Sequence, residues 1–447
     1  MNGKFGKRAA HTLAAALAAA LLAGMAAVSA EEIPRVPYAA AGAETKMDAA
    51  ASVRAKDAYR IVAFGDSLTA GYEYGMDQMD VMPVPYGYVD RLFEQALFRG
   101  RAEMYNYGIL GLQTIGLKNF LAAVERDTPV TEAELGQEKP LPDPRAAAML
   151  KAVPETRAAL SGADLVAVMI GGNDFSPVIG LIGNPAEAEL WLTGALEAYE
   201  SSLEASIRSI AAVNPKARIV VGDVYSPVPK KTGLIGVEPE VYDRLQAVAG
   251  RVRERLEAVT ARLSMEGLQV KPAFPSKAFV GREAAFTAIV ASRGQDIHPS
   301  QSGYQAIGEA FAEAVWGETR AVAPRDATTP ISVIVGGREV LSEFKPVVKN
   351  NRTFLVLRDI ADAVKATTRW EGKTQKATVS LGGTTVELTI GAKTMRVNGR
   401  SVPVDVPAFL QRSGSEIKTY VPLAALSDGL GFQVEYRAKL KAAFINE

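Results

Sequence analysis

Short apolar runs alternate with amphipathic stretches along the first two thirds of the chain. The runs are YRIVAF (59–64), AEMYNYG (102–108), ADLVAVMIG (163–171), ARIVVGDVY (217–225) and LQVKPAF (268–274). The stretches between them have a helical period, and a last one from 302 to 316 places Tyr304, Ile307, Phe311 and Val315 on one face. A repeated strand–helix–strand order predicts an α/β fold, a parallel sheet with helices on both faces.

A different pattern follows a predicted linker at residues 318–330. From 331 to 447, short alternating strands are separated by turn signals such as Gly-Gly and Asn-Gly. The segments that start at Arg352 and Lys418 repeat each other, and each has the pattern of strand, short helix, strand, strand. We predict a separate, smaller α+β domain at 331–447 with an internal duplication.

The beginning of the chain has the pattern of a signal peptide at residues 1–30. Basic residues come first, an alanine-rich apolar run follows from Leu13 to Val28, and small residues precede Glu31. An uncleaved anchor is disfavoured because the run barely reaches membrane-spanning length. We therefore expect a secreted, extracellular protein without stable membrane insertion, and a flexible lead-in at 31–57.

Composition removes several classes of chemistry. The chain has no cysteine and two histidines, of which His11 lies in the predicted leader. Thiolate catalysis, disulfides and imidazole-rich or thiolate metal sites are therefore excluded, and we expect no metal and no cofactor. The formal net charge is zero, which gives no electrostatic reason to expect nucleic acid as a partner.

Four polar or glycine-containing motifs follow the apolar runs or precede the last helix. They contain Ser67 (VAFGDSLTAGY), Gly111 (NYGILGLQT), Asn173 (MIGGNDF), and Asp296 with His298 (DIHPSQSGY). Alone, each has an ordinary explanation as a helix cap or a turn. Together they are more informative, because the carboxyl ends of parallel strands meet at one edge of the sheet.

Acyl transfer by a serine needs a nucleophile, a base, a group that orients the base, and donors to the oxyanion. Ser67, His298 and Asp296 supply the first three. The Ser67 backbone N–H, the Gly111 N–H and the Asn173 side-chain amide supply the donors of an oxyanion hole.

The ordered motifs GDSL (65–68), NYGILG (106–111), GGND (171–174) and DIHP (296–299) resemble those of the SGNH, or GDSL, hydrolases. The likeness covers residues 58–317. It implies a three-layer α/β/α, flavodoxin-like fold, ester hydrolysis, Ser67 as nucleophile and His298 as base.

One position departs from that family. The usual acid stands three residues before the histidine, where this chain has Gln295. Because Pro299 favours an extended His298, residues two apart point to the same side, and we expect Asp296 to reach the imidazole. The rival interpretation is that Asp296 faces solvent and a backbone carbonyl orients His298.

Residues 331–447 resemble a second family, the copper amine oxidase N-terminal-like domain. VVKNNRTFLVLRDIADAV and KTYVPLAALSDGLGFQVEY carry the likeness. Such domains are frequent accessory modules in secreted and surface proteins of spore-forming Gram-positive bacteria. The region has no histidine or cysteine and only Met395, so nothing in it suits copper. We expect a binding or spacing module, with a cell-envelope ligand and cell-wall association.

The leading functional hypothesis is a secreted serine esterase or lipase, including lysophospholipase-like activity. It would act through an acyl-enzyme on a small-molecule, lipid or polysaccharide ester. One alternative is a carbohydrate or peptidoglycan O-acetylesterase, which needs a short polar cleft where a lipase needs a long apolar one. The other is a cell-surface binding protein with an inactive hydrolase domain.

Overall fold

The computed structural model describes residues 58–76, 85–232 and 235–447. The predicted signal peptide and lead-in lie outside these residues. The described chain forms two compact units: residues 60–93 and 103–319 make the N-terminal unit, and residues 94–102 and 320–447 make the C-terminal unit. Within the described ranges, no helix has the length and apolarity that a membrane crossing requires.

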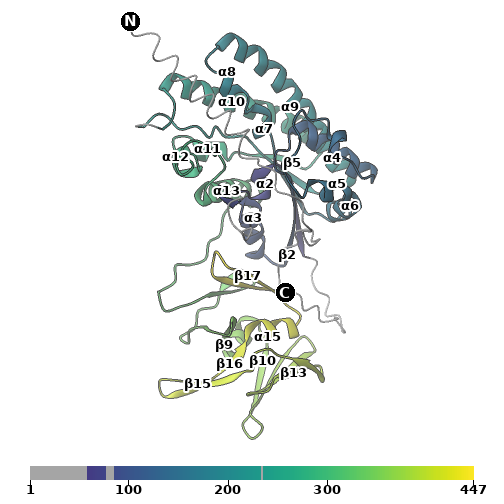
Figure 1. Cartoon of the computed structure of the whole chain (residues 1–447). Coiled ribbons are helices and arrows are strands. Elements are labelled where there is room, and N and C mark those ends of the chain that lie inside the picture. The colour runs from purple at the N-terminus through teal and green to yellow at the C-terminus, as the bar shows by residue number, and fades with distance from the viewer. Residues whose placement is uncertain (1–57, 77–84, 233–234) are drawn as a thin grey trace. The chain divides into compact units, whose positions relative to one another are not determined.

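A five-stranded parallel sheet organises the N-terminal unit, with the strand order β2-β1-β3-β4-β5 (Figure 1). Its strands are β1 (Tyr59–Gly65), β2 (Ala102–Gly108), β3 (Leu165–Met169), β4 (Arg218–Gly222) and β5 (Val270–Ala273). Every residue of the central strand β3 is buried, as expected for a parallel strand covered on both faces. The prediction of a flavodoxin-like α/β sheet is confirmed.

Helices cover both faces of this sheet. The longer ones are α3 (Tyr88–Leu97), α4 (Thr114–Arg126), α6 (Val153–Ser161), α9 (Pro185–Val213), α10 (Pro239–Met265) and α13 (Gln301–Trp316). Apolar residues of α4, α9 and α10 pack against one face, where Val62, Val168 and Val221 lie. On α3 and α13, Tyr88 and Phe311 stack with ring centroids 4.7 Å apart.

Short helices connect these elements. They are α2 (Ser67–Ala70), the 3₁₀ turn η2 (Ala133–Leu135), α5 (Ala146–Lys151), α7 (Gly172–Phe175), α8 (Val178–Leu181), α11 (Ser276–Phe279) and α12 (Glu283–Phe286). The helix α13 starts one residue before its predicted position. The Ser300 hydroxyl accepts a hydrogen bond from the Gly303 N–H, and Gly317 ends the helix in a left-handed conformation.

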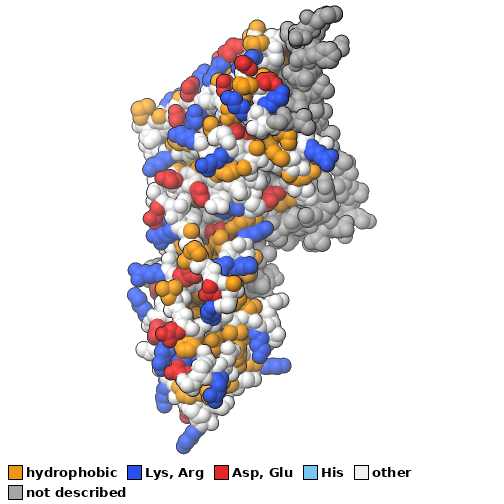
Figure 2. All heavy atoms as spheres, turned by 90° about the vertical axis from the view of Figure 1, so that its left-hand side faces the viewer, with side chains coloured by type: hydrophobic (Ala, Val, Ile, Leu, Met, Phe, Trp, Pro, Cys, Tyr) orange, Lys and Arg blue, Asp and Glu red, His pale blue; other side chains and the backbone are white. Residues whose placement is uncertain are grey.

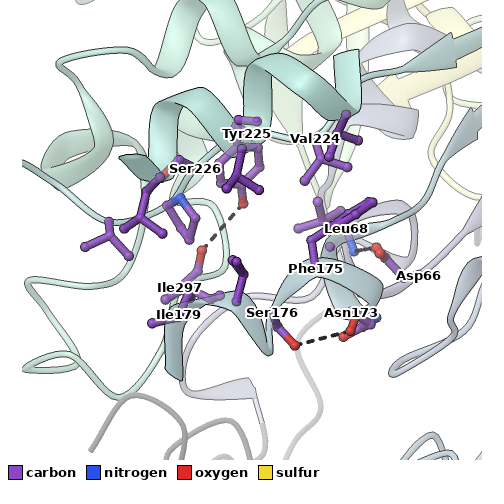
Figure 3. Close-up of a pocket in the computed structure, with 18 of the residues that line it drawn as sticks. Asp66, Leu68, Asn173, Phe175, Ser176, Ile179, Val224, Tyr225, Ser226 and Ile297 are labelled. Atoms are coloured by element: carbon purple, nitrogen blue, oxygen red, sulfur yellow. Dashed lines mark hydrogen bonds between the residues drawn. The ribbon is translucent and has the colours of Figure 1, made fainter. Parts of the chain in front are cut away.

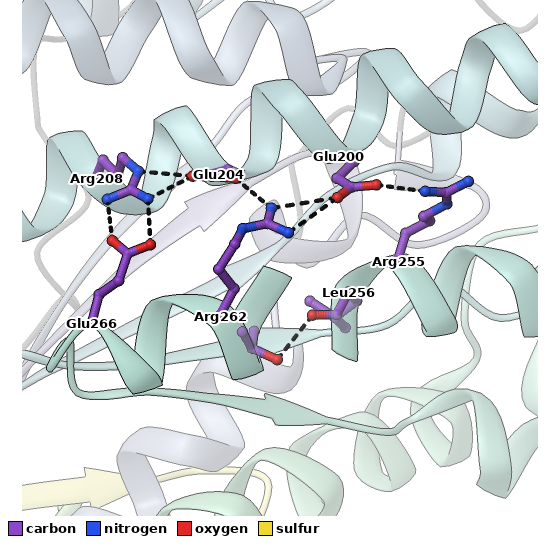
Figure 4. Close-up of polar contacts among 8 residues, drawn as sticks. Glu200, Glu204, Arg208, Arg255, Leu256, Arg262 and Glu266 are labelled. Carbon is purple, nitrogen blue, oxygen red and sulfur yellow. Dashed lines mark hydrogen bonds and ion pairs between the residues drawn. The ribbon is translucent and has the colours of Figure 1, made fainter. Parts of the chain in front are cut away.

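Ion pairs join α9 to the second half of α10 (Figure 4). Glu200 of α9 accepts from Arg255 at 2.8 Å and from Arg262 at 3.4 Å. Arg208 bridges Glu204 of its own helix and Glu266, just beyond α10, at 2.6 and 2.7 Å. Single exposed pairs contribute little to stability, but this connected row fixes the two helices side by side.

The C-terminal unit is mostly β-structure, in three small sheets with the orders β10-β11-β12-β13-β14, β15-β16-β9-β8 and β17-β18-β6-β7. Its strands are β6 (Ser332–Val335), β7 (Arg338–Glu339), β8 (Val347–Lys349), β9 (Arg352–Val356), β10 (Thr367–Glu371), β11 (Lys376–Leu381), β12 (Thr384–Thr389), β13 (Thr394–Val397), β14 (Arg400–Pro403), β15 (Phe409–Ser413), β16 (Glu416–Pro422), β17 (Gln433–Arg437) and β18 (Ala442–Asn446). Two helices accompany them, α14 (Leu357–Ala363) and α15 (Leu423–Gly429).

The internal duplication is visible in the elements themselves. The helices α14 and α15 begin 66 residues apart, and the same offset separates the starts of β10 and β17, and of β11 and β18. The repeats then diverge in their pairing. β10 and β11 belong to the five-stranded sheet, whereas β17 and β18 pair next to β6. The predicted α+β fold with an internal duplication is confirmed, with strands as its dominant element.

Candidate active site

Ser67 lies where β1 turns into α2. A side chain at Gly65 would place its Cβ 2.0 Å from the Met169 carbonyl oxygen, so only glycine lets the end of β1 approach the end of β3 this closely. Asp66 caps the short helix, because its Oδ1 accepts the Leu68 N–H at 2.9 Å. Ser67 is thereby the first helical residue, held at the carboxyl edge of the sheet.

His298 reaches Ser67 from the loop that precedes α13. Its Nε2 lies 2.8 Å from the Ser67 Oγ, although the residues are 231 positions apart. Its Nδ1 lies 2.9 Å from Asp296 Oδ1. With the proton on Nδ1, the ring donates to Asp296 and leaves Nε2 free to accept from the serine hydroxyl.

Asp296 is turned toward the imidazole, and its side chain is only 12% exposed. The same Oδ1 also accepts the backbone N–H of His298 at 2.7 Å. Burial by itself would raise the pKa of Asp296, but the hydrogen bonds and charge of His298 hold that pKa below its ordinary value. Asp296 is therefore ionised at neutral pH, as an orienting group for an imidazolium must be.

The loop around His298 is supported on both sides. The Ser292 hydroxyl donates to the Asp296 carbonyl at 3.1 Å and accepts the Asp296 N–H at 2.8 Å. The His298 carbonyl accepts the Ala288 N–H at 2.9 Å. The ring of Tyr72 packs edge-on against the imidazole, with centroids 4.6 Å apart. These contacts leave the imidazole little freedom to leave the serine.

Asn173 and Gly111 occupy different surroundings. Asn173, in α7, donates from its side-chain nitrogen to the Leu112 carbonyl at 2.9 Å and lines a pocket together with Ser67 and His298. Gly111 lies in the turn after β2 at a φ of +77°, where an added Cβ would meet Pro142 at 2.5 Å, and it is not in the pocket wall. The Asn173–Leu112 bond ties this turn to α7.

Two acidic side chains at this edge have no role in the sequence-based interpretation. Burial raises the pKa of Asp66 to about 7, although the Leu68 N–H and the charge of His298 act in the opposite direction. Desolvation raises the pKa of Asp174 to about 6, and its two oxygens accept the Thr114 N–H at 3.1 and 3.0 Å. The Gly-Asp-Ser and Asn-Asp strings contained both residues but gave no signal of their burial.

A largely apolar pocket extends from the serine and histidine (Figure 3). The empty space within it is about 890 Å³, a figure that includes open solvent at the mouth. Its apolar walls come from the region after Asn173, the segment after β4 and the first half of α10: Phe175, Val178, Ile179, Val224, Tyr225, Pro227, Val228, Leu245, Val248, Ala249 and Val252. The arrangement places a nucleophile and a base in the wall of a largely apolar pocket.

The described residues contain no group of three or more His, Cys, Asp or Glu side chains arranged to hold a metal ion. The chemistry that the arrangement itself supports is proton removal from a serine hydroxyl, with an amide donor beside it.

Two family models match the chain. The model described as the GDSL-like Lipase/Acylhydrolase family matches residues 63–306, and the model described as the Copper amine oxidase N-terminal domain matches residues 334–445. Both resemblances noted in the sequence are thus confirmed. No curated protein matches the chain in sequence.

Several solved structures are similar to part of the chain. The lipase Lip_vut3 from a goat rumen metagenome is 19% identical, covers 57% of this chain and 96% of its own, and has a TM-score of 0.39. An extracellular lipase from Streptomyces rimosus is 16% identical, with coverages of 57% and 100% and a TM-score of 0.40. A variant of an acetyl-xylooligosaccharide esterase from Geobacillus is 17% identical, with coverages of 59% and 97% and a TM-score of 0.35.

Proposed function

Because the chain belongs to the GDSL-like lipase/acylhydrolase family, whose members hydrolyse esters, we propose that it is a secreted serine esterase acting through an acyl-enzyme on Ser67. The observation that carries the proposal is the continuous hydrogen-bonded row from Ser67 Oγ to His298 Nε2 at 2.8 Å, and from Nδ1 to Asp296 at 2.9 Å. This row contains the nucleophile, the base and the orienting acid in contact.

In the first half-reaction, His298 Nε2 takes the hydroxyl proton as Ser67 Oγ forms a bond to the ester carbonyl carbon. The carbonyl oxygen gains the negative charge, and Asp296 stabilises the imidazolium. When the bond to the leaving alcohol oxygen breaks, His298 returns the proton to that oxygen. Water then repeats the sequence on the acyl-enzyme, which releases the carboxylic acid and restores the Ser67 hydroxyl.

The oxyanion would receive hydrogen bonds from the Ser67 N–H, the Gly111 N–H and the Asn173 side chain. Asn173 supports this role best, because its side-chain nitrogen has a second hydrogen besides the one bound to Leu112 and it borders the pocket. Fixed donors of this kind are each worth about 10²–10³ in turnover.

The pocket favours an apolar acyl group over acetate. Its walls come from three separate segments and are dominated by Val, Leu, Ile and Phe side chains. Binding of an apolar acyl group against such walls is favourable in proportion to the apolar surface that is removed from water. We therefore place esterase or lipase activity ahead of the O-acetylesterase alternative. With p-nitrophenyl esters from acetate to palmitate, kcat/KM should rise from acetate to a medium chain, and a strong preference for acetate would contradict the choice.

Labelling with a fluorophosphonate probe tests the mechanism itself. The wild-type chain should become labelled on Ser67, and Ser67→Ala and His298→Ala should abolish the labelling. Ser176→Ala is the matched control, because Ser176 lines the same pocket without touching His298. A wild-type chain that resists the probe would favour the inactive, surface-binding alternative, and labelling that survives His298→Ala would remove His298 as the base.

Export follows from the leader at 1–30, with cell-wall association through residues 331–447 as a part of the proposal. Mass spectrometry of protein from the culture medium of a producing host should find Glu31 as the first residue. Protein that retains residues 1–30 would contradict cleavage at this position.

A further inference from the structure

The helix α10 contributes a wall of the pocket without contributing a candidate catalytic residue. The wall from α7 and α8 carries Asn173, and Ile297 in the pocket wall is the neighbour of His298. Tyr225, in the segment after β4, donates a hydrogen bond to the Ile297 carbonyl at 3.5 Å (Figure 3). In the part of the chain that the structure describes, no hydrogen bond joins α10 to Ser67 or His298. We therefore expect α10 to face the part of the substrate that is remote from the ester.

The pocket residues of α10 occupy one face of the helix. They are Leu245, Val248, Ala249 and Val252, spaced by three or four positions, and they span about 10 Å along the helix axis. Three of them have branched apolar side chains, whereas Ala249 has no atom beyond Cβ. The pocket side of α10 is therefore recessed at Ala249, and we call this position the recess.

Larger side chains are packed on either side of the recess. Leu245 belongs to a buried apolar cluster with Val178 and Val228, so all three walls of the pocket meet there. About two turns further along α10, Val252 belongs to the main core of this unit, as Phe175 of α7 does. The recess lies between these two packed regions.

Contacts to the α8–α9 side hold α10 in place on both sides of the recess. Arg244 donates a hydrogen bond to the carbonyl of Ile182, just after α8, at 2.9 Å. Arg251 pairs with Glu189 of α9 at 2.7 Å. Each exposed contact is weak by itself. Because the two contacts flank Ala249 in the sequence, they oppose an outward movement of α10 that would admit a larger acyl group.

The exposed surface gives a further indication of the substrate. Long-chain lipid esters are presented at an interface, and an enzyme that binds there needs an exposed apolar area. On the face of the molecule drawn in Figure 2, hydrophobic side chains are interspersed with charged ones. Leu190 and Met265 are the most exposed large apolar side chains that the structure describes in this unit, and they lie near opposite ends of the helices α9 and α10. These observations favour a substrate that enters the pocket from solution.

We propose that Ala249 determines the acyl-chain selectivity of the enzyme, and that its substrates are esters of medium-chain fatty acids. The recess receives the far end of the acyl chain, and a longer chain would have to displace the packed side chains of Leu245 or Val252. This inference rests on the proposed esterase function, because it concerns the acyl group bound at the same site.

Substitution of Ala249 tests the inference through selectivity. In Ala249→Leu the new side chain would fill the recess, so the ratio of kcat/KM for p-nitrophenyl octanoate to that for the acetate should fall by at least about 10-fold. Ala249→Val adds fewer atoms and should lower the same ratio by a smaller factor. Steady-state kinetics of the full-length chain measure both variants, and the ratio does not depend on the fraction of each sample that is folded.

The matched control is Ala247→Leu. Ala247 is exposed and lies two positions away on the same helix, so its side chain points away from the pocket face. The control should keep the ratio within about twofold of wild type. An unchanged ratio in Ala249→Leu, or an equal fall in Ala247→Leu, would overturn the assignment of selectivity to Ala249. A wild-type preference for palmitate over octanoate would overturn the medium-chain class.

A binding measurement separates this inference from the esterase function. Octanoate should bind to the full-length Ser67→Ala chain, and adding Ala249→Leu should weaken that binding by at least about 10-fold in a calorimetric titration. If wild type resists the fluorophosphonate probe while this difference in binding holds, the esterase function fails and the assignment of Ala249 to an acyl-binding pocket stands. If Ser67 is labelled and esters are hydrolysed, but Ala249→Leu changes neither the ratio nor the binding, the esterase function stands and this inference fails.

Discussion

The two units differ in what their interiors contain. The N-terminal unit buries carboxyl groups, among them Asp66, Asp143, Asp223 and Glu283. In residues 320–447, all of which the structure describes, the buried polar side chains are uncharged: Ser332, Thr384, Ser427 and Asn446. The buried carboxylate that the C-terminal unit does contain, Glu94, is paired with Arg437 at 2.9 Å.

The position of the buried acids explains the contrast. Asp66, Asp174 and Asp223 follow β1, β3 and β4, so each stands at the carboxyl edge of the sheet. Desolvation raises the pKa of Asp66 to about 7 and those of Asp174 and Asp223 to about 6. A raised pKa means that the ionised form is disfavoured by the fold. Part of this free-energy cost thus lies at the edge where the candidate site lies, which is a usual place for such a cost. In the C-terminal unit, desolvation likewise raises the pKa of Asp428 to about 6.

Among substitutions of acidic residues at this edge of the sheet, Asp296→Asn should affect catalysis most. The amide keeps the size of the side chain but removes the charge that stabilises an imidazolium, so kcat should fall by about 10³–10⁴ with KM little changed. Steady-state kinetics on a p-nitrophenyl ester measure this. An unchanged kcat would show that another group orients His298, although Asp296 is hydrogen-bonded to it.

Asp66→Asn tests the cost of the buried acids through stability. Asp66 has a pKa of about 7 in the fold against 3.8 for an ordinary carboxyl, so the native state binds more protons than the unfolded state between these values. The free energy of unfolding therefore falls as pH rises from about 4 to about 7. Asn can still cap α2 but does not titrate. In the variant, the decrease in the free energy of unfolding over this pH range should therefore be smaller by about 4 kcal/mol. Urea unfolding at several pH values measures it, and an identical slope in wild type and variant would contradict a buried, titrating Asp66.

Asn173→Ala should lower kcat by about 10²–10³, because one donor to the oxyanion is lost in the transition state. KM should change little. Ser176→Ala, in the same pocket wall, should remain close to wild type. A rise in KM with an unchanged kcat would instead assign Asn173 to ground-state binding.

The smallest effect on catalysis should come from the C-terminal core. Leu426 and Ile360 are fully buried and occupy equivalent positions of the two repeats. Replacing either by Ala should cost about 2–5 kcal/mol of stability and leave kcat/KM within about twofold at a temperature where the unit stays folded. Thermal unfolding and ester kinetics on the same samples measure both. A large loss of turnover would show that the accessory unit takes part in catalysis.

Much of the fold is predictable from local patterns. The central strands β1, β3 and β4 are predictable because a parallel strand that is buried on both faces needs continuous apolar residues, whereas the edge strands β2 and β5 also carry polar residues. The limits of α13 follow from Ser300 and Gly317, whose caps are local. The duplication is visible because the offset of 66 residues is the same for helices and strands.

The pocket could not be predicted in the same way. The pocket walls combine the segments around Val178 and Val224 with Leu245 of α10. No pattern in the sequence predicts that these segments lie close together. Gly111 stays a predicted oxyanion donor, in the turn after β2 where an added Cβ would meet Pro142 at 2.5 Å.

The short connection between Asp296 and His298 has an evolutionary consequence. One carboxylate oxygen accepts both the backbone N–H and the ring Nδ1–H of His298, so the acid and the base form a unit closed within three consecutive residues. An insertion or deletion earlier in the loop would move both together. A change of length just before Asp296 would disturb its two hydrogen bonds to Ser292, but it would not separate the proton acceptor from its counter-charge.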